Sequence, residues 1–146
     1  MTFRPLTVAN IEAARVFWST IQGLRLTSAD EAGPLAGFFE RNPDLSWGAF
    51  DRERLVATVL AGHDGRRGFL YHLAVDAACR GQGLSSELMR RALAGLAQCK
   101  IGKVHVFVLA DNPGGLSFWA GAARDGWARR EDVLVFSRDN RQSTNA

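Results

Sequence analysis

The sequence predicts an α/β fold whose sheet is organised around one junction between a strand and a helix. Residues 69–75 are rich in aromatic and branched side chains and have the length of a strand, whereas Leu84, Leu88, Met89, Ala92 and Leu96 recur at helical spacing. The turn Arg80-Gly81-Gln82-Gly83 joins the two segments. Residues 103–109 then form another short apolar run. A strand, a helix and a second strand in this order imply a parallel crossover.

Length, composition and charge agree with one globular domain. The chain has 146 residues, of which 47% are hydrophobic and 23% charged, which excludes wholesale disorder. No apolar run approaches the ~20 residues that cross a bilayer, and the first residues, MTFRPLT, contain no signal core. The net charge of +3 comes from scattered basic residues without a nucleic-acid-reading motif. We therefore expect a cytoplasmic protein with neither nucleic acid nor a membrane as its partner.

The cysteines and histidines predict neither a disulfide nor a metal site. Cys79 and Cys99 bracket the central helix, which would hold its ends about 20 Å apart, whereas a disulfide needs Cα atoms within about 7 Å. The three histidines show no metal-ligand spacing with these cysteines. We expect two free thiols and no metal.

The N-terminal part is expected to contain a strand at residues 2–6 followed by two helices. The first helix, capped by Thr7, should end near Gly23. Its apolar face is formed by Ile11, Ala14, Trp18 and Ile21. The second helix should begin at a capping box over residues 28–31 and stop at Asn42-Pro43.

Three strands are expected next. Residues 46–50 and 54–61 are joined by a polar turn, and residues 63–68 form a second turn before the strand at 69–75. The central helix should then run from about Leu84 to Gln98.

The C-terminal part is expected to contain a helix and a last strand. Asn112-Pro113 supplies a cap and a first-turn proline, and Gly126 closes this helix. Residues 133–138 should form the last strand, and the polar tail at 139–146 should fray. We therefore expect one domain over residues 1–138 and a tail over 139–146.

The glycine turn has the features of an anion site. The first N–H groups of a helix lack internal partners, and the helix dipole adds positive charge there, so this position binds phosphate groups. Gly81 and Gly83 let a ligand approach the backbone, and Arg80 adds a cation. The alternative is a tight turn with a solvated arginine. A dinucleotide fingerprint fits poorly because Ser86 replaces the third glycine, and no GK[ST] follows as in a P-loop.

The strand, the pattern R-x-x-G-x-(G/A) and the helix resemble the acyl-CoA-binding motif of the GNAT superfamily of N-acyltransferases. Here the motif is Arg80-Gly81-Gln82-Gly83-Leu84-Ser85, with Ser85 in place of the usual Gly or Ala. Asn112, Phe118-Trp119 and residues 125–127 also resemble the family's N-x6-(Y)…GF segment. The middle of the chain is most similar to small bacterial single-domain, YpeA-like members.

The resemblance covers residues 2–138 and implies the GNAT fold. That fold is a central mixed, mostly antiparallel β-sheet with helices on both faces. Its order is a strand, two helices, three strands, a helix, a strand, a helix and two final strands.

The resemblance also implies acetyl-CoA as the cosubstrate and assigns residues to it. The backbone of Leu73, Ala74 and Val75 would pair with the pantetheine arm, and the N–H groups from Arg80 to Ser85 (Arg80, Gly81, Gln82, Gly83, Leu84 and Ser85) would hold the pyrophosphate. Asn112 would contact the acyl-CoA, although it also suits a simple helix cap. Trp119 would pack against the pantetheine or acyl arm.

The catalytic side chains match the family less well. Trp119 stands where members often carry a tyrosine acid, and Phe107 where some carry a glutamate base. Tyr71, the only tyrosine, shares a strand face with Leu73 by the period of two, which makes it the candidate catalytic residue. His72 is expected on the opposite face, and we interpret it as a satisfied core histidine.

The resemblance implies an N-acetyltransferase that moves the acetyl group to a primary amine by direct attack in a ternary complex. A non-catalytic acyl-CoA-binding or sensing module is the alternative. The acceptor would be a small-molecule amine or a peptide N-terminus, and the protein a monomer or homodimer. The acceptor site carries no motif, and the aromatic candidates for its lining are more simply explained as core: Trp18, Phe38, Phe39 and Trp47.

Overall fold

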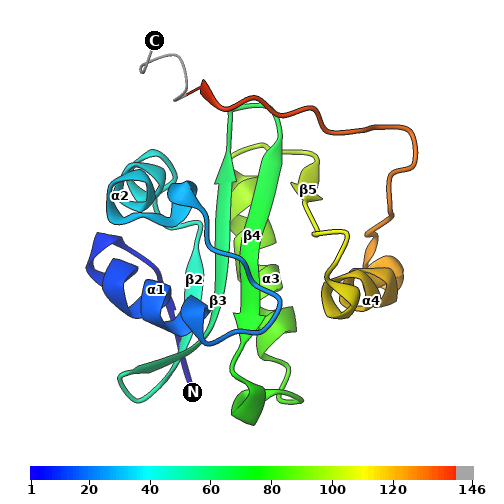
Figure 1. The fold of residues 1–146 in the computed structure, drawn as a ribbon. Helices are drawn as coiled ribbons and strands as arrows, with labels where there is room; N and C mark the ends of the chain where they lie inside the picture. The colour runs from blue at the N-terminus through cyan, green and yellow to red at the C-terminus, as the bar shows by residue number, and fades with distance from the viewer. Residues whose placement is uncertain (141–146) are drawn as a thin grey trace. The chain divides into compact units, whose positions relative to one another are not determined.

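A five-stranded sheet in the order β1-β2-β3-β4-β5 forms the centre of the computed structural model, which describes residues 1–140 (Figure 1). Its strands are β1 (Thr2–Pro5), β2 (Trp47–Asp51), β3 (Arg54–His63), β4 (Gly68–Val75) and β5 (Val104–Val106). Neighbouring strands are antiparallel except for β4 and β5, which are parallel. The expected mixed, mostly antiparallel sheet is confirmed.

The helices of residues 1–107 cover both faces of this sheet (Figure 1). They are α1 (Ile11–Ser19), α2 (Ala32–Arg41) and α3 (Leu84–Gln98). Trp18 and Phe39 join Leu60 and Ala74 of the sheet in one buried cluster, so α1 and α2 share a face. The fully buried Leu88 and Leu96 of α3 belong to the other face.

Short 3-10 helices open the first two helices. Thr7 caps Val8–Asn10 ahead of α1, and Thr27 caps Ser28–Asp30 ahead of α2. In the second case the Thr27 side chain accepts from the backbone while Asp30 accepts from the Thr27 N–H. The capping box was predicted one residue too late, because Thr27-x-x-Asp30, not residues 28–31, makes the reciprocal bonds.

Residues 108–140 belong to a second compact unit, described here by itself. It contains α4 (Pro113–Gly121) and a 3-10 helix at Ala122–Asp125, which Gly126 closes with φ +93°. The helix expected after Asn112 is confirmed.

The last two expected strands are wrong for the described residues, and β5 is shorter than the predicted run of 103–109. Residues 133–136 are 55–94% exposed and have no strand partner within residues 1–140. Apolar, branched residues favour a strand, but a strand also needs a neighbouring edge to pair with. The single domain over 1–138 stays a prediction, and residues 141–146 of the expected tail lie outside the described residues.

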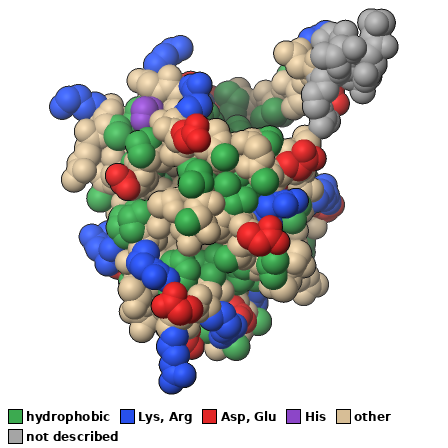
Figure 2. Space-filling model, turned by 90° about the vertical axis from the view of Figure 1, so that its left-hand side faces the viewer, with side chains coloured by type: hydrophobic (Ala, Val, Ile, Leu, Met, Phe, Trp, Pro, Cys, Tyr) green, Lys and Arg blue, Asp and Glu red, His purple; other side chains and the backbone are tan. Residues whose placement is uncertain are grey.

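Charged and apolar side chains are mixed over the face that carries α1 and α2 (Figure 2). Basic and acidic groups of this face alternate, so it shows no large patch of one sign. Each helix within residues 1–140 is too short or too polar to cross a membrane.

Candidate active site

The candidate site begins at a half-open edge of β4. This strand pairs with β3 from Gly68 to Val75, but it pairs with β5 only over residues 68–70. Within residues 1–140, the second edge of β4 therefore has no strand partner from Tyr71 to Val75. Backbone N–H and C=O groups on such an edge can pair with an extended ligand.

A β-bulge interrupts β4 in the middle of this open stretch. Tyr71 lies opposite Leu60 and Ala74 opposite Thr58, so two residues of β4, His72 and Leu73, face one residue of β3. His72 adopts a left-handed backbone with φ +49°. The bulge turns the local backbone away from a regular ladder.

Three hydrogen-bonding groups hold the bulge in place. The indole N–H of Trp18 donates to the Thr58 hydroxyl at 2.9 Å, and that hydroxyl donates to the His72 carbonyl at 2.8 Å. Trp18 and Thr58 are both fully buried. Since buried polar groups seldom lack partners, this relay fixes the conformation of the bulge.

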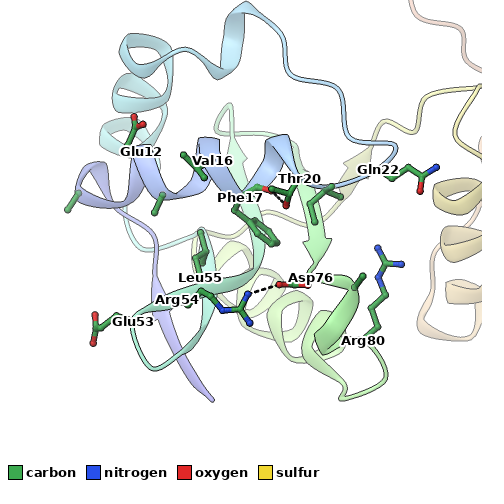
Figure 3. A pocket seen from close by; sticks show the side chains of 14 residues that line it. Glu12, Val16, Phe17, Thr20, Gln22, Glu53, Arg54, Leu55, Asp76 and Arg80 are labelled. Carbon is green, nitrogen blue, oxygen red and sulfur yellow. Dashed lines mark hydrogen bonds and ion pairs between the residues drawn. The ribbon is translucent and has the colours of Figure 1, made fainter.

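Asp76 anchors the loop that follows β4. Its carboxylate accepts from the Ala78 N–H at 3.0 Å and from the Arg54 guanidinium at 2.8 Å (Figure 3). The Ala78 N–H and then the Arg54 guanidinium lower the pKa of the Asp76 carboxyl below its usual value. The ionised carboxylate therefore ties the beginning of the loop to β3 at neutral pH.

The glycine turn exposes the beginning of α3. Gly81 and Gly83 have φ of +79° and +77°, a region that side-chain-bearing residues rarely adopt. Gly83 is the N-cap of α3. Because glycine has no side chain, it cannot accept a hydrogen bond from the first N–H groups of the helix. Added Cβ atoms at both glycines would meet nothing within 4 Å, which leaves open space around the turn.

The other motif residues differ in their exposure. The side chains of Arg80 and Gln82 are exposed, Leu84 is buried in the core and Ser85 is half-buried. Leu84 can therefore offer only its backbone to a ligand, whereas Arg80 can offer a cation.

An open cleft of about 980 Å³ adjoins this loop (Figure 3). It is lined by one side of α1, the beginning of β3 and the segment from Asp76 to Arg80. Figure 3 shows the Arg80 side chain extending away from the Arg54–Asp76 pair. Neither Tyr71 nor His72 lines this cleft, so it flanks the glycine turn and not the bulge.

Tyr71 lies on the sheet face that carries α1 and α2. Its ring is 6.2 Å from Phe69, in a stacked arrangement, and 6.1 Å from Phe38 of α2. The side chain is 37% exposed, and partial burial raises the pKa of its phenol. At neutral pH the hydroxyl is therefore protonated and can donate a hydrogen bond.

His72 lies on the same face as Tyr71, which corrects the expectation that it points to the opposite one. Its Nε2 is 2.7 Å from the Asp30 carboxylate, and its ring meets the edge of Trp18 at 4.7 Å. The bulge breaks the alternation of faces on which the prediction rested. The expected satisfied histidine is paired, but 18% of its side chain is exposed.

Asp30 is the residue that the sequence reasoning missed. It is 7% exposed, and its second carboxylate oxygen accepts the Thr27 N–H at 2.9 Å. The capping pattern Thr27-x-x-Asp30 was a local signal for its position, although nothing local indicated His72 as its partner.

Asn112 and Trp119 belong to the second unit. The Asn112 side chain accepts the Gly115 N–H at 3.1 Å, which confirms its capping role. Trp119 packs edge-on against Phe118 at 5.1 Å and Trp127 at 4.8 Å. Any contact of these two residues with a ligand stays a prediction.

The remaining aromatic residues are mostly structural. Trp18 and Phe39 are buried in the core, as expected. Trp47 is half-buried, with the Arg91 guanidinium 4.9 Å from its ring centroid. Phe38 contacts the candidate catalytic residue Tyr71, and Trp18 packs against His72.

Both cysteines are free thiols, as their spacing predicts. Among residues 1–140, no group of three or more His, Cys, Asp or Glu side chains could hold a metal ion.

Comparison with known proteins gives the site its context. Residues 11–121 match the profile of the acetyltransferase (GNAT) family. An acetyltransferase of Pectobacterium atrosepticum is 30% identical over 112 residues, which cover 77% of this chain and 79% of that protein.

Solved structures share the fold at low sequence identity. The aminoglycoside 6'-N-acetyltransferase AAC(6')-IG of Acinetobacter haemolyticus has a TM-score of 0.72 at 20% identity, over 95% of this chain and 99% of that one. The PaiA N-acetyltransferase of Thermoplasma acidophilum, in complex with coenzyme A, has a TM-score of 0.70 at 16% identity, over 90% and 92%. From the profile match and the 30% identical relative, the chain belongs to the acetyltransferase (GNAT) family.

Proposed function

We propose that this protein transfers an acetyl group from acetyl-CoA to a primary amine by direct attack in a ternary complex. The observation that carries the proposal is the open, bulged edge of β4, which the loop at residues 76–83 joins to the uncapped beginning of α3. An extended, amide-containing arm that ends in a pyrophosphate fits such a path. The CoA-bound structure with the same fold supports this choice of cosubstrate.

The residues present fit acetyl-CoA. Leu73, Ala74 and Val75 offer backbone groups on the open edge of β4 to the pantetheine arm. The turn from Arg80 to Ser85 offers N–H groups, the positive end of the α3 dipole and an exposed guanidinium to the pyrophosphate. Asn112 and Trp119, in the second unit, are assigned to the cosubstrate on the family resemblance alone.

Acetyl-CoA supplies an acetyl group that is already activated as a thioester. A backbone N–H of the bulge at His72 or Leu73 polarises the carbonyl as an oxyanion donor. Tyr71, protonated at neutral pH, orders the amine or a water beside it. A thiol has a pKa of about 8.5, so CoA leaves as a thiolate without an obligatory acid.

The acceptor is a small-molecule amine or a peptide N-terminus. The name of the Acinetobacter structure, an aminoglycoside N-acetyltransferase, supports a nitrogen acceptor. A monomer or homodimer in the cytoplasm stays our prediction for the protein's state and location.

The second candidate is a non-catalytic acyl-CoA-binding module. It is favoured by Trp119 and Phe107, which replace the tyrosine and glutamate that other members use. Thiol release from acetyl-CoA with a panel of amines separates the two functions. Release that depends on an amine supports the enzyme, whereas binding of acetyl-CoA without release with any amine supports the module.

Calorimetry of CoA binding tests the assigned loop. We expect Gly83→Val to weaken CoA binding strongly, because valine disfavours φ +77° and would distort the N–H groups of the turn. Gly65→Val is a matched control, since Gly65 also has positive φ (+90°) and open surroundings but lies in the β3–β4 turn. Unchanged CoA affinity in folded Gly83→Val would remove the basis of the assignment.

A further inference from the structure

We propose that His72, oriented by Asp30, is the base that accepts the proton of the attacking amine. This inference rests on the proposed acetyl transfer and names a catalytic residue for it. It arises from a pairing that joins residues 42 positions apart in the sequence.

The Asp30 carboxylate fixes the orientation of the imidazole. One oxygen lies 2.7 Å from His72 Nε2, and the other accepts the Thr27 N–H at 2.9 Å. Asp30 is 7% exposed. Each of its two carboxylate oxygens therefore has a hydrogen-bond partner in a largely buried position. A carboxylate at Nε2 favours the neutral tautomer in which Nε2 carries the proton and Nδ1 has a free lone pair.

The backbone places this imidazole beside the proposed reaction centre. His72 is itself a residue of the bulge, between Tyr71 and Leu73, and its side chain is 18% exposed. The Thr58 hydroxyl holds its carbonyl, and the Trp18 ring packs against its imidazole. The imidazole is therefore held by its neighbours, partly exposed and on the same sheet face as Tyr71.

The left-handed backbone of His72 supports a functional role. A residue other than glycine at φ +49° is strained, and such strain persists where the surrounding structure enforces it, often at active sites. Fastening β4 to the α1–α2 connection does not by itself require a titratable side chain, since apolar residues can replace buried pairs.

The step balances as a simple acyl transfer. The amine nitrogen forms a C–N bond to the acetyl carbon, and the C–S bond to CoA breaks. The N–H proton that the nitrogen must lose passes to His72 Nδ1, and the electron pair of the C–S bond leaves with the thiolate. Bulk water then removes the proton from the imidazolium.

Kinetics of two variants test this role. We expect His72→Gln and Asp30→Asn to lower kcat about 100-fold or more, the range typical of lost general base catalysis, with CoA affinity within about twofold of the parent. His63→Gln is the matched control, because the His63 side chain accepts the Gly65 N–H in the β3–β4 turn, away from the bulge. Its kcat should equal that of the parent.

Nitrogen-15 NMR of the free protein provides a readout that does not depend on turnover. We expect the neutral His72 ring to carry its proton on Nε2, and Asp30→Asn to shift the tautomer balance toward Nδ1. A neutral parent ring protonated on Nδ1 would overturn the proposal even if the variants fail to fold.

The outcomes also separate this proposal from the function on which it rests. An active parent together with an equally active, folded His72→Gln overturns the base and leaves acetyl transfer intact. A parent that binds acetyl-CoA but releases no thiol with any amine overturns both.

Discussion

Replacing Thr58 by valine tests whether the hydrogen-bond relay holds the bulge of β4. Thr58 is fully buried, and valine has almost the same shape, so the change removes the hydroxyl without opening a cavity. Two groups lose their partner: the Trp18 indole N–H, at 2.9 Å, and the His72 carbonyl, at 2.8 Å.

The two losses differ in size because the two groups differ in exposure. Trp18 is fully buried, so its orphaned N–H costs about 1–3 kcal/mol. The His72 carbonyl belongs to a half-buried residue, and the loss of its hydrogen bond costs about 0.5–1.5 kcal/mol. We expect the free energy of unfolding to fall by about 1.5–4.5 kcal/mol, or the Tm by about 5–14 °C for a chain of this size.

Thermal and urea unfolding followed by circular dichroism measure this loss. Thr58→Ser keeps the hydroxyl and should retain most of the stability, losing about 1 kcal/mol for the deleted methyl group. Thr20→Val removes a hydroxyl that bonds the Phe17 carbonyl at the exposed end of α1, and it should change stability by less than about 0.5 kcal/mol. If Thr58→Val unfolds within about 0.5 kcal/mol of the parent, the relay does not stabilise the bulge.

Four further predictions concern the site. Tyr71→Phe should lower kcat about 10-fold or more with little change in CoA affinity, as steady-state kinetics and calorimetry can show; a parent rate would mean that the Tyr71 hydroxyl does not order the amine in the transition state. Asp76→Ala removes the cap of the loop and the partner of Arg54, and should weaken CoA binding roughly fivefold, which calorimetry checks against the parent. Because the pKa of Asp76 is lowered, its anchoring is present above the ordinary carboxyl pKa of ~3.9 and is lost only as the pH falls through the lowered value. CoA affinity should therefore show no titration of Asp76 from about pH 5 to pH 8, and a loss of affinity that follows an aspartate titration in that window would contradict the anchoring role. With chemistry rate-limiting, kcat/KM should rise with pH as the acceptor amine loses its proton, and a rate that is flat across the amine's own titration argues against direct attack.

Local sequence patterns were sufficient for most of the elements. Helical spacing and the flanking glycine placed α3 at Leu84–Gln98, and Asn112-Pro113 placed the beginning of α4. These signals depend only on neighbours within a few residues. They therefore predict a helix without knowledge of the tertiary structure.

The bulge could not be predicted from the sequence, and one part of the site prediction was therefore wrong. A bulge that contains no glycine leaves no clear mark in the sequence, and this bulge reversed the face assigned to His72. The pairing of His72 with Asp30 depends on how the α1–α2 connection lies over β4. Such a non-local contact cannot be predicted from the spacing of apolar residues. The expected last strand failed for a related reason, because apolar composition at 133–138 does not say whether a pairing edge exists.

The exposed run at residues 133–136 has a consequence for handling the protein. Val133, Leu134, Val135 and Phe136 form an uncharged, β-prone stretch of the kind that stacks between chains into cross-β aggregates. Charged residues precede it, in the ion pairs Arg129–Glu131 and Arg130–Asp132, and Arg138 and Asp139 follow it. Such flanking charges act as gatekeepers against self-association. High salt, which screens these charges, should therefore promote precipitation at high protein concentration.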